Sequence, residues 1–507
     1  MKNKENIVDL IKSLSKSEKR YFKLFVSNNS IGESSHYLKL FDLIEETGSA
    51  EKQTIQKLYG DDHFMKIGFR VYKNLLYKQI LKSLRSYHSE GSVDDRVMEL
   101  IRDSKILFER NLHQNAIKIL AKAKSIAIKY EKNTLLLEVI QWEKKIIRAL
   151  FGKTTEKQII DLSKEEKLVV HKIDNAIEYW KVSTQMLHSY RINGVARTKE
   201  DVEKYNTIFR VPPLKKKELP LSYEAKKNYL FTHLLHFLTN NNLEGFYEYT
   251  KKIVHLMETY PEQIVDKPSN YSNALYNFII STKSLNKYEE FFSMILKLKS
   301  LFKKFELPIT HLIACNVIEF SGYIKIGQLK KAELLLTEIE AIINQQKDAN
   351  EVFIINRTLF YFVTKKYHKA LISLNEILNN ENIYLSQEHY TFAKIFQLII
   401  HFEKGNHDFL PYLIIAIYKF LLQKKKLFKF ESLLIKFIRN RINIIKSEKE
   451  EKEAFKALHK ELVIISADSM EARFLEHFDI ISWLESKIEN RSFGEILREK
   501  AGIQFEI

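Results

Sequence analysis

The 507-residue chain contains 45% hydrophobic and 29% charged residues, a balance typical of globular proteins that excludes wholesale disorder. This length exceeds the size at which one hydrophobic core keeps growing, so we expect several domains or a repeat array. Only 13 glycines and 7 prolines are present, too few for the many tight turns of sandwiches, barrels and propellers. The composition therefore predicts an all-α protein.

The formal net charge of +17 suggests a nucleic-acid partner, because lysine and arginine neutralise phosphates. Arginine supplies only 16 of the 81 basic side chains, although its planar fork is the better group for bidentate contacts with phosphate and guanine. The lysine excess therefore favours a solvated surface at least as strongly as a nucleic-acid surface.

Cysteine usage and the apolar segments indicate the compartment. Cys315 is the only cysteine, so no intramolecular disulfide can form, and no Cys/His cluster has zinc-finger spacing. The start of the chain leads into the amphipathic segment Ile7 to Leu14 and has no apolar core of a secretion signal. The longest apolar stretch, Leu410 to Leu422, is too short to span a bilayer. We expect a soluble cytoplasmic protein with no membrane partner.

Residues 1–90 predict an N-terminal helical bundle. Ser15 and Glu18 have the spacing of a capping box, in which the hydroxyl and the carboxylate bond free amides at a helix start. A longer helix is predicted from about Phe64 to Tyr87. Its basic residues raise the alternative of a DNA-reading helix, but they lie all round the predicted helix, as on a solvated surface: Lys66, Arg70, Lys73, Lys78, Lys82 and Arg85.

A first solenoid segment is predicted over residues 91–210 and a second over residues 229–446. Between them, residues 211–228 contain three prolines beside three consecutive lysines, which indicates a linker or crossing loop. In the first segment the spacing predicts one helical hairpin, with a turn near Asn111 and a packing face on the following helix. The residues of this pattern are Leu107, Asn111, His113, Ala116, Leu120 and Ala123.

Five further hairpins are predicted in the second segment, at intervals of 42, 41, 38 and 40 residues. Around each anchor the positions at minus three, plus four and plus seven are filled in a consistent way. Such a period indicates helical hairpins stacked side by side. The anchors are Tyr249, Phe291, Ala332, Ala370 and Leu410.

Two copies carry a family resemblance: Tyr323 to Ala332 (YIKIGQLKKA) and Tyr361 to Ala370 (YFVTKKYHKA). A tyrosine, a tolerant turn residue, an aromatic or leucine and a small alanine follow one another in both. Over about residues 95–450 the chain resembles the tetratricopeptide-like (TPR-like) α-solenoids. It lacks the family's Trp and Leu-Gly pair, and its periods exceed the usual roughly 34 residues, so we expect longer helices and an irregular superhelix. The family hosts many unrelated partners, so the resemblance implies a scaffold with a groove.

Residues 447–507 predict a helical C-terminal cap, because a solenoid must cover the exposed face of its last repeat. The apolar residues that would do so stand at helical spacing: Ile480, Trp483, Leu484 and Ile488.

No sequence pattern supports an enzyme. Phosphate-binding loops, dinucleotide-binding glycines, nucleophile elbows and kinase signatures are all missing, and we expect no cofactor. His233 and His236 lie on one helix face and could share a metal ion, but no carboxylate or cysteine nearby completes a ligand set. A packed or interfacial histidine pair is the favoured interpretation.

The leading functional hypothesis is a non-enzymatic adaptor or regulator that holds a protein or peptide in the solenoid groove. In the TPR-like family the first helices of the hairpins line that groove, so contact residues should come from them. Amide and aromatic side chains suit an extended peptide. The candidates are Asn316, Glu319, Asn356, Phe360, Gln397 and His401.

The competing hypothesis is nucleic-acid binding through a basic helix. Residues 410–450 contain ten Lys or Arg and three Glu, a local charge of +7. Phe430, Leu434, Phe437 and Ile438 should pack on the solenoid, leaving the cations on another side. A solvated lysine-rich face explains the same pattern and is favoured over binding. The stripe consists of Lys425, Lys429, Lys436, Arg439 and Lys446.

Overall fold

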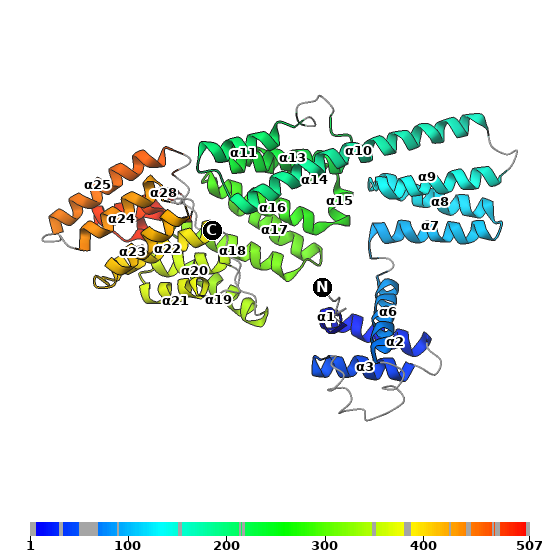
Figure 1. Cartoon of the computed structure of the whole chain (residues 1–507), viewed down its shortest axis with the longest axis horizontal. Helices are drawn as coiled ribbons and strands as arrows, with labels where there is room; N and C mark the ends of the chain where they lie inside the picture. Colours follow the sequence, from blue (N-terminus) through cyan, green and yellow to red (C-terminus); the bar gives the residue numbers. More distant parts are fainter. Residues whose placement is uncertain are drawn as a thin grey trace. The chain divides into compact units, whose positions relative to one another are not determined.

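The computed structural model describes residues 7–29, 34–49, 69–88, 91–150, 155–211, 214, 219–346, 351–379, 387–424, 427–442, 448–468, 471 and 477–502. Within these ranges the chain forms α-helices and no β-strand, which confirms the all-α prediction (Figure 1). The chain divides into two compact units, Met1–His171 and Lys172–Ile507. The division falls inside the long helix α10 (Glu156–Asn193).

The first unit begins with the predicted bundle. Its described helices α1 (Ile7–Ser13), α2 (Lys16–Asn29), α3 (Ser34–Thr47) and α6 (Phe69–Tyr87) enclose a core of their own. The predicted capping box is present: the Ser15 N–H donates to Glu18 Oε2 at 2.7 Å, and the Glu18 N–H donates to Ser15 Oγ at 3.2 Å. The first residues of the predicted long helix, Phe64 to Gly68, lie outside the described ranges.

The rest of the first unit consists of α7 (Val93–Glu109), α8 (His113–Lys129), α9 (Asn133–Ala149) and the first part of α10. The hairpin predicted from the sequence is α7–α8. Asn111 makes its turn with a φ of 62°, and the predicted packing face of α8 is fully buried. That face consists of Ala116, Leu120 and Ala123.

Consecutive helices of the second unit pack against one another in pairs. After α10 and α11 (Lys199–Phe209) come the pairs α13 (Tyr223–Thr239) with α14 (Leu243–Thr259), α16 (Pro268–Ser284) with α17 (Tyr288–Lys304), α18 (Ile309–Lys325) with α19 (Leu329–Gln346), α20 (Glu351–Val363) with α21 (Tyr367–Leu378), and α22 (Gln387–Glu403) with α23 (Leu410–Gln423). A short helix α15 (Pro261–Asp266) precedes α16, and α24 (Lys429–Ile442), α25 (Glu448–Ser466), α27 (Ile480–Glu489) and α28 (Phe493–Ala501) follow α23.

Helix α13 begins inside the range predicted to be a linker. Ser222 caps it, because its side chain accepts a hydrogen bond from the Ala225 N–H, so the last part of that range is helical. Most of the residues between the three prolines lie outside the described ranges.

The hairpin turns share one backbone feature. A residue with positive φ stands five positions before each of four predicted anchors: Asn286, Gly327, Lys365 and Gly405 precede Phe291, Ala332, Ala370 and Leu410, which are all fully buried. In the α13–α14 hairpin the residue with positive φ is Asn241, and the buried residue five positions later is Phe246. The predicted anchor Tyr249 is therefore one helical turn too late, because positions three apart share a helix face and satisfy the same pattern.

The C-terminal helices cover more than the last repeat. α25 packs on α24, as a cap should, and α28 also reaches back to α18 of an earlier hairpin. The rings of Phe478 and Phe493 pack edge-on against Phe362 of α20. The indole N–H of Trp483 donates to Glu403 of α22 at 2.6 Å. The apolar side chains predicted for the cap therefore also join the core of α18 to α24.

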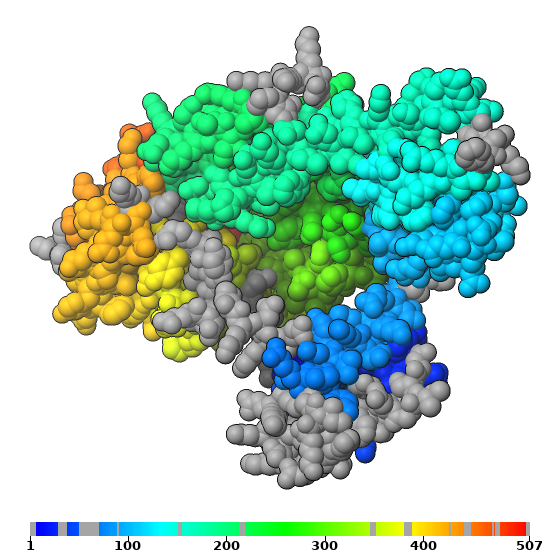
Figure 2. Space-filling model, turned by 45° about the vertical axis from the view of Figure 1, so that its right-hand side comes forward, coloured from blue at the N-terminus to red at the C-terminus, as the bar shows by residue number. Residues whose placement is uncertain are grey.

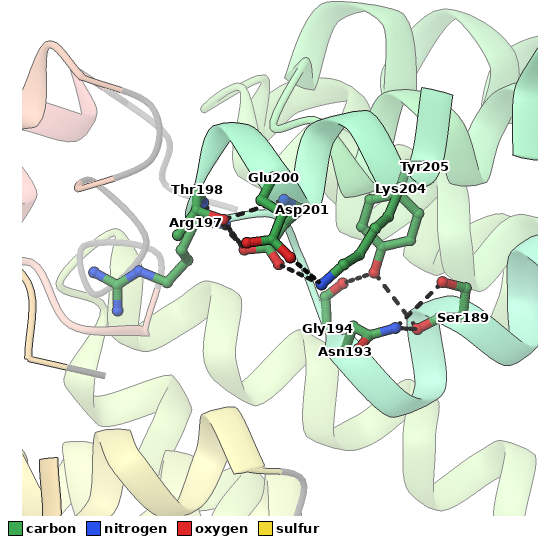
Figure 3. Close-up of polar contacts among 9 residues, drawn as sticks. All are labelled: Ser189, Asn193, Gly194, Arg197, Thr198, Glu200, Asp201, Lys204 and Tyr205. Atoms are coloured by element: carbon green, nitrogen blue, oxygen red, sulfur yellow. Dashed lines mark hydrogen bonds and ion pairs between the residues drawn. The ribbon is translucent and has the colours of Figure 1, made fainter. Parts of the chain in front are cut away.

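A buried ion pair joins the start of the second unit to α24. Arg197, in the turn between α10 and α11, points away from α11 (Figure 3). Its guanidinium lies 2.8 Å from a carboxylate oxygen of Glu431 on α24 and 3.8 Å from the ring centre of Phe428. The Glu431 side chain is 1% exposed, so its buried carboxylate charge would be strongly destabilising without Arg197.

We expect Gly327→Ala to destabilise the second unit more than Gly405→Ala. Both glycines have φ near +70°, which costs an alanine about 1–2 kcal/mol. At Gly405 an added Cβ would meet nothing closer than 3.9 Å, whereas at Gly327 it would lie 2.5 Å from the Gly494 carbonyl oxygen. Urea unfolding and limited proteolysis of α28 measure the difference, and equal effects of the two substitutions would contradict the close packing of α28 on this turn.

We expect Arg197→Met to cost about 3–5 kcal/mol of unfolding free energy, because it leaves the buried Glu431 carboxylate unpaired. Arg210→Met removes the partner of Glu203 from an ion pair whose side chains are both 57% exposed, and should cost less than about 1 kcal/mol. The double variant Arg197→Met/Glu431→Leu should recover part of the loss. Chemical denaturation measures all three, and a small cost for Arg197→Met would show that Glu431 does not depend on this pair.

Candidate functional site

The strongest candidate site is a hollow of about 350 Å³ between the α13–α14 and α16–α17 hairpins, which we call the asparagine hollow. Both α13 and α16 are first helices of their hairpins, and α14 supplies the wall between them. The lining residues are Lys227, Asn228, Phe231, Leu234, Thr250, Ile253, Met257, Asn270, Asn273, Ala274 and Asn277.

The wall of the hollow is apolar. Leu234 of α13 and Ile253 and Met257 of α14 are buried and belong to the core of this part of the chain, and Phe231 is half-buried against it. Helix α14 places Ile253 and Met257 on one face because they are four residues apart. An apolar group that enters the hollow would therefore displace water from the edge of a preformed core.

The polar rim comes mainly from α16. Asn270, Asn273 and Asn277 stand at intervals of three and four residues, which brings their amides to one face of the helix. Asn273 is exposed, Asn270 and Asn277 are half-buried, and none of the three side chains has a hydrogen-bond partner in the described part of the chain. These amides therefore offer donors and acceptors that the fold does not use.

The other polar groups of the hollow are already satisfied. Asn228 donates to the Glu224 carbonyl at 2.9 Å and accepts from the Ser183 hydroxyl at 3.0 Å. Thr250 is buried and donates to the Tyr247 carbonyl at 2.8 Å. Lys227 forms an ion pair with Glu224 at 2.6 Å. Unused hydrogen-bonding capacity is thus concentrated on α16.

The predicted groove residues lie on α18, α20 and α22, and none lines the asparagine hollow. Asn316 and Glu319 of α18 are both 7% exposed. Glu319 forms an ion pair with Lys299 at 2.5 Å and accepts from the Tyr323 hydroxyl at 3.3 Å. The fold uses this carboxylate internally.

The remaining groove candidates also have internal contacts or limited exposure. Asn356 donates to the Val352 carbonyl at 2.8 Å, and Phe360 is buried. A ring nitrogen of His401 lies 2.8 Å from the Asn406 amide, and Gln397 is half-buried. Contact of these six residues with a partner stays a prediction.

Helix α24 carries the described part of the basic stripe. Lys429, Lys436 and Arg439 are exposed, while Lys425 and Lys446 lie outside the described residues. The predicted apolar side is confirmed, because Phe430, Leu434 and Ile438 are buried and Phe437 is half-buried. The cations and the packing face thus lie on different sides of α24.

The histidine pair packs against aromatic rings. His233 stacks on Tyr249 with ring centres 4.8 Å apart, and His236 stacks on Phe209 at 3.9 Å. Burial, with a further contribution from His233, lowers the pKa of His236 to about 4, so this ring is neutral near pH 7. The described residues contain no group of three or more His, Cys, Asp or Glu side chains arranged to hold a metal ion.

Comparison with known proteins supplies no family for this chain, since neither a protein-family model nor a curated sequence matches it. Among the helices described, none combines the length and apolar character needed to cross a bilayer. What the chain binds is therefore inferred from the site itself.

The asparagine hollow was not predicted from the sequence. The predicted groove residues stand on the first helices next to the clearest repeat turns, α18, α20 and α22, whereas the unpaired amides lie on α16. A pattern that could have found them is asparagine at positions i, i+3 and i+7 of one first helix, as in Asn270, Asn273 and Asn277.

We expect the triple variant Asn270→Ala/Asn273→Ala/Asn277→Ala to be at least as stable as the parent. Asparagine is a poorer helix former than alanine by up to about 0.7 kcal/mol, and these side chains make no hydrogen bonds that would be lost. Asn228→Ala should instead destabilise by about 1 kcal/mol, because it removes two hydrogen bonds. Thermal unfolding measures both, and a marked loss of stability in the triple variant would show that α16 needs these amides for folding.

Proposed function

We propose that this protein is a non-enzymatic adaptor or regulator that holds an extended peptide segment of a partner protein in the asparagine hollow. The observation that carries the proposal is the row of three unpaired amides on α16 above an apolar wall. These amides stabilise neither the helix nor the rest of the fold. Such residues are expected at binding sites, where function is retained at the expense of stability.

The spacing of the amides suits an extended backbone. Asn270 and Asn277 are seven residues apart, which corresponds to about 10 Å along a helix. An extended chain rises about 3.3 Å per residue, so the row spans about three peptide residues. Each asparagine offers an acceptor oxygen and two N–H donors, which matches the alternating carbonyls and amides of such a segment.

The volume and the apolar wall of the hollow indicate which kind of side chain the bound peptide carries. A hollow of about 350 Å³ lies at the lower end of the range for small-ligand pockets. Phe231, Ile253 and Met257 would surround one large apolar side chain and leave the backbone on the asparagine rim. The preferred ligand is therefore a short extended peptide with one apolar anchor.

The resemblance to TPR-like repeats supports this location. In that family the first helices of the hairpins line the groove, and α13 and α16 are both first helices. In its more specific form, we propose that the protein is a cytoplasmic TPR-like scaffold that binds peptides.

Nucleic-acid binding through the basic stripe is the second candidate. It is supported by the exposure of Lys429, Lys436 and Arg439, none of which forms an ion pair in the described part of the chain. Five phosphate contacts would make log K fall with log salt at a slope of about −4.5 on duplex DNA and about −3.5 on a single strand. Peptide binding in an apolar hollow should respond weakly to salt.

The test is a selection of peptides from a random display library on the full-length chain, followed by titration of the best peptide. The Asn270→Ala/Asn273→Ala/Asn277→Ala variant should bind at least about tenfold more weakly, because each lost hydrogen bond is worth about 0.5–1.5 kcal/mol. Asn375→Ala, which changes an exposed asparagine on α21, is the matched control and should bind as the parent does.

Two outcomes contradict the proposal. One is a triple variant that binds the selected peptide as tightly as the parent does. The other is a selection without an apolar consensus, together with retention of nucleic acid alone from a cell extract at about 50 mM salt, where electrostatic binding is strong.

A further inference from the structure

A second surface, on the second helix α23, exposes large apolar side chains. Tyr412, Ile415, Tyr418 and Leu422 are between 44% and 74% exposed, and their spacing keeps them on the side of α23 opposite its buried residues. Leu413, Ile414, Ile417 and Leu421 form that buried side. Helix α23 is therefore apolar on both sides, although the fold covers only one.

The described parts of α23 and α24 expose five cations and no acid. Lys419 and Lys424 are exposed on α23, and Lys429, Lys436 and Arg439 on the adjacent α24. None of the five forms an ion pair in the described part of the chain. The single acid of the two helices, Glu431, is buried against Arg197. We call the exposed apolar residues of α23 and these five cations together the α23–α24 surface. Both helices fall in the yellow-to-orange part of the colour bar in Figure 2.

We propose that the α23–α24 surface docks an acidic amphipathic helix of a partner protein. Its apolar face would cover Tyr412, Ile415, Tyr418 and Leu422, and its acidic flanks would pair with the lysines and Arg439. This inference goes beyond the peptide site, because it concerns a second helix and a ligand of different chemistry.

The length of the apolar side fits a helix. Tyr412 and Leu422 are ten residues apart, which is about 15 Å or roughly three helical turns. A partner helix lying alongside α23 would present apolar residues at i, i+3 or i+4 and i+7 to this row. The packing would repeat that of α22 and α24 against α23.

Charge and side-chain chemistry decide against two other occupants. A second copy of the same surface would bring cations of like sign together, which repel. A nucleic acid would use the cations and the tyrosine rings, but it would leave Ile415 and Leu422 exposed to water or against phosphates. An acidic amphipathic helix is the occupant that uses both the aliphatic side chains and the charges.

The experiment titrates the full-length chain with a synthetic peptide of about 18 residues, long enough for roughly five helical turns, with leucines on one face and glutamates on the other. A scrambled peptide of the same composition is the first comparison. A single-stranded oligouridylate of about 20 nucleotides, longer than the roughly 4–16 nucleotides that one single-strand-binding fold covers, is the second. The helical peptide should bind, and the other two ligands should bind at least about tenfold more weakly.

Two sets of variants test the residues. Ile415→Ser/Leu422→Ser should weaken binding of the helical peptide by about tenfold, because it removes two apolar contacts. The matched control Leu296→Ser changes a leucine on α17 that is 69% exposed and should have no effect. Lys436→Gln/Arg439→Gln should weaken binding at low salt, and its difference from the parent should shrink at high salt. Lys303→Gln, an exposed lysine of α17, is its control.

Equal binding of the scrambled peptide would overturn the proposal, because a purely electrostatic surface needs no apolar face. Absence of binding by the helical peptide would overturn it as well. Tight oligouridylate binding that is lost in Lys436→Gln/Arg439→Gln would assign the surface to nucleic acid instead. The side chains substituted on α23, α24 and α17 are all exposed, so unchanged thermal unfolding verifies that these variants fold. The asparagine triple variant on α16 should bind the helical peptide as the parent does.

Discussion

The close approach of two helices at each hairpin turn is the constraint on which the second unit depends. Every such turn reverses the chain through a residue with positive φ, and five residues later a buried side chain sits at the crossing. Asparagine and glycine occupy most of these turn positions because they tolerate this backbone conformation best. Lys365 is the exception in the second unit, and its turn is followed by Ala370, the smallest of side chains with a Cβ. Once the crossings are fixed, the direction of each successive hairpin follows.

Long-range polar contacts then fix how the hairpins close on one another. Arg197 and Glu431 are 234 residues apart in sequence and meet in a buried ion pair. Glu403 receives the Trp483 indole N–H and forms an ion pair with Lys487, both on α27. Buried charges of this kind are costly unless paired, so they favour one arrangement of the hairpins over its alternatives. The carboxylates that bring distant helices together are therefore occupied by the fold itself.

The two proposed surfaces stand out against this background. Many polar groups of the described second unit are paired with one another, such as Thr250 with Ser281 in the core. The amides of α16 make no side-chain hydrogen bond and the exposed cations of α24 no ion pair in the described part of the chain, and each set lies near apolar side chains. A first helix and a second helix of a hairpin array face different sides, so a peptide in the asparagine hollow need not exclude a helix on α23. An adaptor that brings two partners together would need this separation.

The sequence by itself determined the helical class, the hairpin period and most packing faces. Scarcity of glycine and proline excludes sheet-rich folds, and burial at a period near 40 residues requires stacked hairpins, so these features depend on local spacing alone. The predicted anchor Tyr249 lies three residues after Phe246, the buried residue that follows the turn. Spacing alone could not distinguish the two, because both lie on the same face of the helix. Only the tertiary structure decided which polar side chains remain unpaired. Glu319 and Asn277 are both polar residues of first helices, yet one is joined to Lys299 of the preceding hairpin and the other faces a hollow. That difference depends on which residues of distant helices arrive beside them, and no local pattern contains it.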